Sequence, residues 1–183
     1  IKDNIDIKGL VTSAGSLALE NNIAKENAFL IDQLIKNGFH IKGKANLSEW
    51  ANFRSTKSVS GWSSIKGQTT HHLDSKYNPC GSSSGSAVAV ASGIVEIAIG
   101  TETNGSITCP ASIAGIVGFK PTVGLVSRTG IIPIAESQDT AGPMGNTVEI
   151  IAKTMEAIAG PDPRDASTNN IPSYFNYNFL DFA

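Results

Sequence analysis

Serines, rather than histidines or metal ligands, are the residues of this sequence whose type and spacing could carry chemistry. Ser82 lies in the Gly-Ser run Gly81–Ser86, and Ser106 follows the pair Asn104-Gly105. A Ser-His-Asp site needs an imidazole base, but none of the three histidines lies beside a nucleophile motif such as Gly-x-Ser-x-Gly. A serine nucleophile in this chain would therefore need a different base.

The run Gly81–Ser86 also has a second interpretation. Ahead of a helix, its backbone N–H groups could hold an anion. However, the run lacks the Gly-Lys-Ser/Thr ending of a P-loop and the Gly-x-Gly-x-x-Gly spacing of a dinucleotide site. Taken alone, the run is typical of a flexible turn, and Asn104-Gly105 is typical of an ordinary turn. Neither serine is assigned a role by its own motif.

The composition is that of a globular domain with a real core. Of 183 residues, 40% are hydrophobic and 16% charged, and the net charge is −2. No cluster of basic residues indicates nucleic-acid binding, and the longest apolar stretch is too short and interrupted to span a membrane. Because the chain opens at Ile1 without Met, we expect it to be a fragment of a longer protein.

Two cysteines, Cys80 and Cys109, are too few for a disulfide framework. No Cys-x-x-Cys motif or histidine cluster indicates zinc, so no metal site is expected. We interpret the two residues as small buried thiols.

The elements that must position these residues follow from hydrophobic periodicity. Helical spacing or small apolar residues predict helices over residues 24–36, 87–91 and 147–159, and Gly38 is expected to stop the first of them. Short apolar runs predict strands over residues 39–42, 94–100, 115–119 and 124–127. A helical turn over 47–53 and a long surface loop over 54–79 lie between them. Alternating helices and strands favour an α/β fold.

Three segments taken together resemble the amidase signature family: Ile1–Asn4, Pro79–Ala87 and Gly100–Ile107. The stretches 47–55, 118–127 and 138–144 also match, so the resemblance extends from residue 2 to about 160. Within the family it is closest to the peptide-amidase-like branch, which shares Asn-Pro-Cys-Gly-Ser-Ser-Ser-Gly-Ser and Gly-Thr-Glu-Thr. The implied fold is a mixed central β-sheet flanked by helices, incomplete here because family members are much longer.

The resemblance implies a Ser-cisSer-Lys triad. Ser106 would be the nucleophile, Ser82 the bridging serine after a cis peptide bond, and Lys2 the base, with Ser83 in a supporting role. The oxyanion hole would be built from the backbone N–H groups of Thr103, Asn104, Gly105 and Ser106. No cofactor or metal is implied.

Lys2 can act as a base only when its amine is neutral. An ordinary lysine has a pKa of about 10.4, and burial lowers that value by up to about 3–5 units. The apolar neighbours Ile1 and Ile5 fit a desolvated amine. The carboxylate of Asp3 would oppose this effect on the pKa unless it points away.

The function that this resemblance implies is amide hydrolysis through an acyl-enzyme. The alternatives are a glutamine-hydrolysing A-type subunit of an aminoacyl-tRNA amidotransferase and an inactive fragment. The expected partner is a small amide or amidated peptide substrate, with no nucleic acid and no membrane; a homo-oligomer or a partner subunit stays open. We expect a partial core over residues 1–160, a Pro/Asn-rich tail over 161–183, and a cytoplasmic location, with secretion or the periplasm left open.

The two cysteines give a further hypothesis. Because Cys80 precedes Ser82 by two residues and Cys109 follows Ser106 by three, both thiols are expected near the site. A thiol reagent would then slow acylation.

Overall fold

Three antiparallel strands form the centre of the structure, a computed structural model that describes residues 1–183. Their order in the sheet is β3 (Ile97–Glu102), β5 (Thr140–Gly145) and β4 (Val117–Gly118). β3 pairs with β5 along its whole length, from Ile97 opposite Gly145 to Glu102 opposite Thr140. The segment that follows β3 therefore leaves the sheet beside the segment that precedes β5.

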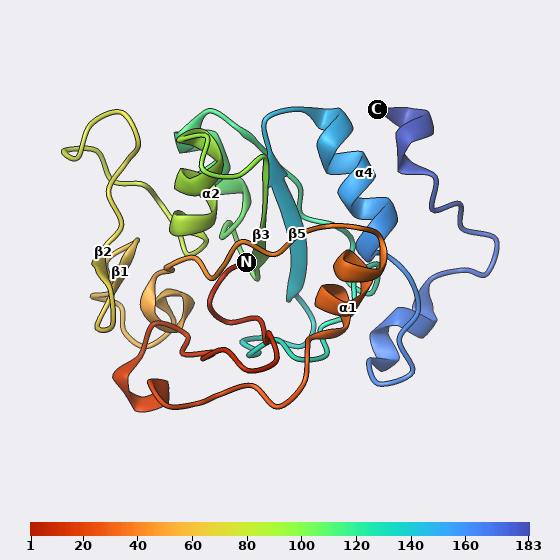
Figure 1. Cartoon of the computed structure of the whole chain (residues 1–183), viewed down its shortest axis with the longest axis horizontal. Helices are drawn as coiled ribbons and strands as arrows, with labels where there is room; N and C mark the ends of the chain where they lie inside the picture. The colour runs from red at the N-terminus through yellow and green to blue at the C-terminus, as the bar shows by residue number, and fades with distance from the viewer.

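Helices cover both faces of this sheet (Figure 1). On one face lie α1 (Phe29–Lys36) and α4 (Val148–Ile158), and on the other lie α2 (Ser84–Ala91) and α3 (Thr108–Ala114). Side chains of a strand alternate between its two faces. Ala141 of β5 accordingly joins the core under α1 and α4, whereas Met144 joins the core under α2 and α3. This arrangement confirms the predicted α/β class.

The two cores differ in size and in the residues that fill them. The larger one, on the α1 and α4 side, is built mostly from branched aliphatic residues, among them Ile5, Leu30, Ile31, Ile99 and Ile158. The smaller one consists of Ala87, Ile107, Ala111, Ala114 and Met144. Small side chains let α2 and α3 pack closely on the sheet, which brings the helix ends near the strand ends.

The first predicted helix begins later than expected. α1 starts at Phe29 rather than near residue 24, because the N–H groups of Ala28 and Phe29 donate to the carbonyl oxygens of Asp6 and Thr129. Because these two N–H groups bind carbonyl oxygens of distant segments, they are not available for an earlier helical turn. Its end is as predicted, since Gly38 adopts a left-handed conformation with φ of +82°. The helix predicted over residues 147–159 is confirmed as α4, and α2 begins three residues before its prediction.

Two predicted strands are wrong. Residues 39–42 form no strand because no neighbouring strand pairs with them, and residues 124–127 contribute only an isolated bridge from Val126 to Ala159. The strand predicted over 94–100 is displaced toward the C-terminus as β3. The strand predicted over 115–119 is confirmed in its central part as β4.

The region between α1 and α2 holds shorter elements. Within the predicted loop 54–79, a small hairpin is formed by β1 (Trp62–Ser63) and β2 (Gly67–Gln68). The predicted turn over 47–53 is the 3-10 element η2 (Glu49–Asn52), although Trp50, Ala51 and Asn52 all have positive φ. The other 3-10 elements are η1 (Leu17–Leu19), η3 (Ala166–Asn170) and η4 (Phe179–Phe182). The longest helix has 11 residues, and no helix is long and apolar enough to cross a membrane.

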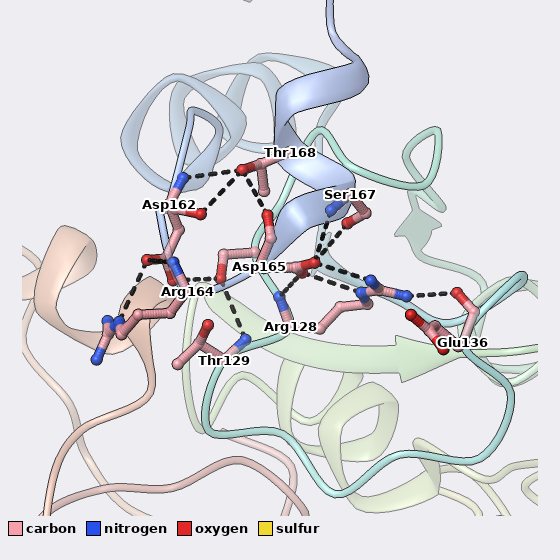
Figure 2. A network of polar contacts seen from close by, with 9 residues as sticks. Arg128, Thr129, Glu136, Asp162, Arg164, Asp165, Ser167 and Thr168 are labelled. Carbon is pink, nitrogen blue, oxygen red and sulfur yellow. Dashed lines mark hydrogen bonds and ion pairs between the residues drawn. The ribbon is translucent and has the colours of Figure 1, made fainter.

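A partly buried polar network fastens the first part of the C-terminal segment to the core (Figure 2). Arg128 is its centre: its Nε and Nη2 atoms donate to the two carboxylate oxygens of Asp165 at 3.0 and 2.8 Å. The backbone N–H of Arg128 also donates to Asp165, and Nη1 donates to the carbonyl oxygen of Glu136. Such two-pronged pairing is the strong form of a charge-assisted hydrogen bond.

Asp162 provides a second anchor in the same segment. It is 1% exposed, accepts a hydrogen bond from Ser127 at 2.7 Å and pairs with Arg164. The hydroxyl of Thr168 donates to the carbonyl oxygen of Asp162 at 3.1 Å (Figure 2). Residues 162–168 are therefore bonded to the segment that carries Ser127 and Arg128. The boundary at residue 160 itself stays a prediction.

We expect Asp165→Asn to lower the free energy of unfolding by about 1–3 kcal/mol, because it leaves the Arg128 fork partly unpaired. The hydrogen bond from Arg128 lowers the pKa of Asp165 in the folded protein. The stabilisation from this carboxylate is therefore fully present above the unfolded pKa of about 3.9 and is lost as pH falls from there toward the lower folded pKa. Urea unfolding at neutral and acidic pH measures both effects. Asp181→Asn, at an exposed position, is the control. Equal stability of the two variants at neutral pH would contradict the expectation.

Candidate active site

Lys2 is held beside β3 by its backbone. Its N–H donates to the carbonyl oxygen of Ile99 at 3.0 Å, and it forms an isolated parallel bridge with Ala45. The side chain is fully buried, with 0% exposure, and extends to the end of β3 at which Thr101 lies. A lysine in this position has no contact with bulk water.

Three oxygen atoms surround the Lys2 amine. Its Nζ lies 2.7 Å from Ser82 Oγ, 2.8 Å from Thr101 Oγ1 and 3.0 Å from the Thr101 carbonyl oxygen. None of the three belongs to a carboxylate. Asn4 also donates to Thr101 Oγ1, at 2.9 Å, so the threonine hydroxyl is shared between two side chains.

Ser82 and Ser83 lie immediately before α2 and are fully buried. The Gly81–Ser82 peptide bond is cis. Ser83 links this segment to β3, because its hydroxyl donates to the Thr101 carbonyl oxygen and accepts the Thr101 N–H. This close approach of Ser83 to β3 requires glycine at position 100, where a Cβ would lie 2.7 Å from Ser83 Oγ.

Ser106 lies in the turn that joins β3 to α3. The buried carboxylate of Glu102 organises this turn by accepting the backbone N–H groups of Gly105, Ile107 and Thr108 at 2.8–2.9 Å. Gly105 has φ of +85°, which favours glycine. The Ser106 carbonyl oxygen accepts the N–H of Ser83 at 3.1 Å, which joins the two serine segments directly.

The structure therefore brings the residues singled out from the sequence into one region. Lys2 and Ser82 are in direct contact, and the Ser106 backbone is bonded to that of Ser83. The Oγ atom of Ser106 makes no hydrogen bond within the chain, and the residue is 8% exposed. A hydroxyl in this state is free to meet a ligand.

Of the four backbone N–H groups expected in the oxyanion hole, one is already engaged. The N–H of Gly105 donates to Glu102, whereas those of Thr103, Asn104 and Ser106 have no acceptor within the chain. The turn thus leaves three donors to bind an anionic or polarised oxygen.

Burial dominates the electrostatics of Lys2. Desolvation lowers the pKa of its amine to about 7, against the opposing effect of the Glu102 and Asp139 carboxylates. Asp3 points away from the amine, because it pairs with Lys44 at 3.1 Å and accepts from Ser13. The amide hydrogen bonds hold the pKa of Glu102 below its ordinary value despite its burial. Near neutral pH the amine is therefore divided between its neutral and protonated forms, while Glu102 stays ionised.

Two cavities adjoin this region. One, of about 490 Å³, is lined by residues 101–103 at the end of β3, and the other, of about 500 Å³, by Trp50, Ala51 and Phe53. Asn4 and residues 132–134 line both cavities. Their mixed polar and apolar walls suit a small organic ligand with a few polar groups.

Thr101 and Glu102 are the site residues that sequence reasoning did not single out. Both belong to the stretch Gly-Thr-Glu-Thr that carries the family resemblance, but no catalytic motif assigns them a role. Thr101 has its effect through its hydroxyl and carbonyl oxygens, and Glu102 through backbone N–H groups. Many residue types can make contacts of this kind, so the identity of the residue alone does not reveal its role.

The interpretation of Cys80 and Cys109 as two thiols is wrong. They form a disulfide, and no free cysteine is left. The backbone contact between the two serine segments brings the Cα atoms of these cysteines to 6.0 Å, within the range that a disulfide spans. The disulfide links the two segments that carry Ser82 and Ser106, and its nearness to a catalytic site stays a prediction. A thiol reagent has no free thiol to modify in this structure.

The buried lysine and serines lie beside the end of β3, an edge strand of the helix-flanked sheet. The chain belongs to the amidase signature family: the family model described as Amidase matches residues 1–180.

Solved structures and curated relatives agree with this assignment. The chain superposes on the peptide amidase from Stenotrophomonas maltophilia with a TM-score of 0.95 and 54% identity, covering 98% of this chain and 37% of that one. An amidase family protein from Bacillus anthracis gives a TM-score of 0.92 with 43% identity, over 97% and 36% of the two chains. The A-type subunit of the glutamyl-tRNA(Gln) amidotransferase from Symbiobacterium thermophilum is 46% identical over 91% of this chain and 33% of its own. The chain thus spans about a third of the length of these relatives.

Opening the disulfide is expected to destabilise the fold. With a sequence separation of 29 residues, loop-closure entropy predicts a loss of about 3–4 kcal/mol on reduction or in Cys109→Ser. Urea unfolding with and without a reductant measures it. Reductant should lower the urea midpoint of the protein without substitutions, but not the midpoint of Cys109→Ser or of its matched variant Cys80→Ser. If reductant leaves the midpoint of the unsubstituted protein where it was, the disulfide is contradicted.

Proposed function

We propose that the protein to which this chain belongs hydrolyses carboxylic amides, with Ser106 as nucleophile, Ser82 as proton relay and Lys2 as base. The observation that carries this proposal is the contact of 2.7 Å between a buried amine and the Ser82 hydroxyl, in a segment whose next residue, Ser83, donates its N–H to the Ser106 carbonyl oxygen. Family membership supports amide chemistry. The residue roles rest on the geometry and on their place in the matching segments.

The surroundings of Lys2 suit the neutral form that a base requires. A neutral amine has two N–H groups and one lone pair. Both N–H groups find acceptors on Thr101, its carbonyl and hydroxyl oxygens, so the lone pair is directed at Ser82. The protonated amine has three donors for the same three oxygens. The site can therefore hold the lysine before and after it takes a proton.

Acylation then follows with a balanced transfer of protons. Ser106 Oγ forms a bond to the amide carbonyl carbon while its proton passes to Ser82, and the Ser82 proton passes to Lys2. The C–N bond breaks as the leaving amine takes a proton back through Ser82. Water attacks the acyl-enzyme by the same relay, which releases the acid and restores Ser106.

The negative charge that develops on the carbonyl oxygen would be met by the free N–H groups of Thr103, Asn104 and Ser106. Glu102 supports this role because it fixes the turn without consuming those three groups. Gly105, whose N–H is engaged, would contribute shape and close approach instead of a donor.

We propose a small amide or amidated peptide as substrate, bound in the two cavities beside the end of β3. The 54% identity to a peptide amidase supports this class. The second candidate, a glutamine-hydrolysing A-type subunit, is supported by the 46% identity to the corresponding subunit of a glutamyl-tRNA(Gln) amidotransferase. The same three residues would serve both, so the discriminating observation is a partner subunit that co-purifies with the protein.

A fluorophosphonate reagent is expected to bond to Ser106, because it reacts with activated serine hydroxyls. Ser106→Ala should abolish labelling and Lys2→Ala should slow it by about 10²–10⁴-fold, whereas Ser92→Ala, at an exposed position, should label normally. Mass spectrometry of the digested protein identifies the labelled residue. Labelling that survives Ser106→Ala would contradict the proposed nucleophile, and no labelling of a folded sample would favour an inactive fragment.

The acylation rate should rise with pH through about 7, the pKa of Lys2. Below that value the amine is protonated and cannot accept a proton, so the rate falls roughly tenfold per pH unit; above it, the rate levels off. Measuring the second-order rate of fluorophosphonate labelling across this range gives the profile. A rate that does not change between about pH 5 and pH 9 would exclude Lys2 as the titrating base.

A further inference from the structure

Asp139 lies immediately before β5 and contacts the proposed oxyanion turn. The ladder between β3 and β5 ends with Glu102 opposite Thr140, so the next residues outward are Thr103 and Asp139. Thr103 Oγ1 donates to Asp139 Oδ1 at 2.5 Å. The first residue of the turn is thereby tied to β5 through a side chain, at the point where backbone pairing stops.

The second oxygen of the same carboxylate holds a different segment. Asp139 Oδ2 accepts the backbone N–H groups of Ile134 and Ala135 at 2.7 and 2.9 Å. Ile134 lines both cavities beside the site. One carboxylate therefore joins the turn that carries the free N–H donors to the wall of the cavities that would hold the substrate.

We propose that Asp139 is a positioning residue for the proposed amide hydrolysis, on which this inference rests. Through Thr103 it fixes the start of the turn 103–106 and the direction of its free N–H groups. Through Ile134 and Ala135 it fixes the cavity wall relative to that turn. A change at Asp139 reaches the reaction through these two contacts, one affecting the transition state and one affecting substrate binding. Its carboxylate also raises the pKa of Lys2 and lines the cavity of about 490 Å³, so the variants are compared well above pH 7, where Lys2 is neutral in all of them.

The chemistry of the side chain decides which substitution tests its role. Its two oxygens accept three donors, one from a hydroxyl and two from backbone N–H groups. Asparagine can keep all three contacts, because its oxygen accepts the two loop N–H groups while its amide N–H donates to the Thr103 hydroxyl, whereas alanine keeps none of them. Displacing catalytic groups by about 1 Å costs on the order of 10²-fold in rate, so a loosened turn has a measurable effect.

Three variants separate the effects of these two contacts. Asp139→Ala is expected to lower kcat by about 10–100-fold and to raise KM, because it releases both the turn and the cavity wall. Thr103→Val, which removes only the hydroxyl, should lower kcat with little change in KM. Thr103→Ser keeps the hydroxyl and should restore kcat to near that of the unchanged protein. The double variant Asp139→Ala with Thr103→Val should have a kcat no lower than Asp139→Ala alone.

The measurement uses protein expressed from its full reading frame, a simple amide substrate, and a count of active sites by fluorophosphonate labelling, so that kcat refers to folded sites. Glu149→Gln removes a negative charge at an exposed, unbonded position of α4 and should leave both constants unchanged.

Two results would overturn the role of Asp139: a kcat per labelled site within about twofold of the unsubstituted protein in Asp139→Ala, or a Thr103→Ser variant as slow as Thr103→Val. The Thr103 pair decides the question if Asp139→Ala does not fold. Failure of the proposed function is recognised separately, since the unchanged protein would then not be labelled at Ser106.

Discussion

A buried amine without a counter-ion is the constraint on which the rest of this structure depends. Lys2 has no ion pair and no exposure, and only neutral oxygens contact its Nζ. Burying an unpaired charge is costly, so the amine loses its proton more readily than an exposed lysine does. Every neighbouring segment contributes to this environment: β3 through Thr101, the residues before α2 through Ser82, and the N-terminal segment through Asn4.

The carboxylates near this amine are occupied elsewhere. Glu102 is surrounded by backbone N–H groups of the turn, Asp139 by Thr103 and the 134–135 loop, and Asp3 by Lys44 and Ser13. Each acid therefore organises backbone or pairs with another side chain instead of forming an ion pair with Lys2. The carboxylates are thus close enough to raise the pKa of Lys2, but none of them forms an ion pair with its amine.

Sequence reasoning reached the fold class and the positions of α4 and β4, because hydrophobic periodicity is a local property. It anticipated the contact between Lys2 and Ser82 only through the family resemblance. It placed strands at residues 39–42 and 124–127 wrongly, since a strand needs a partner that its own residues do not specify. It missed Thr101 because that residue has its effect through hydrogen bonds and not through a recognisable motif. It missed the disulfide because the approach of Cys80 to Cys109 depends on how two distant turns pack.

That disulfide has a consequence for how and where the protein matures. Covalent pairing of Cys80 with Cys109 requires the segment before α2 and the start of α3 to be already close, so oxidation reports that the serine region has assembled. Disulfides persist in oxidising compartments, whereas thioredoxin and glutathione keep most cytosolic cysteines reduced. The redox state of this single pair in protein taken from its native source would therefore record both correct assembly and the compartment in which the chain folded.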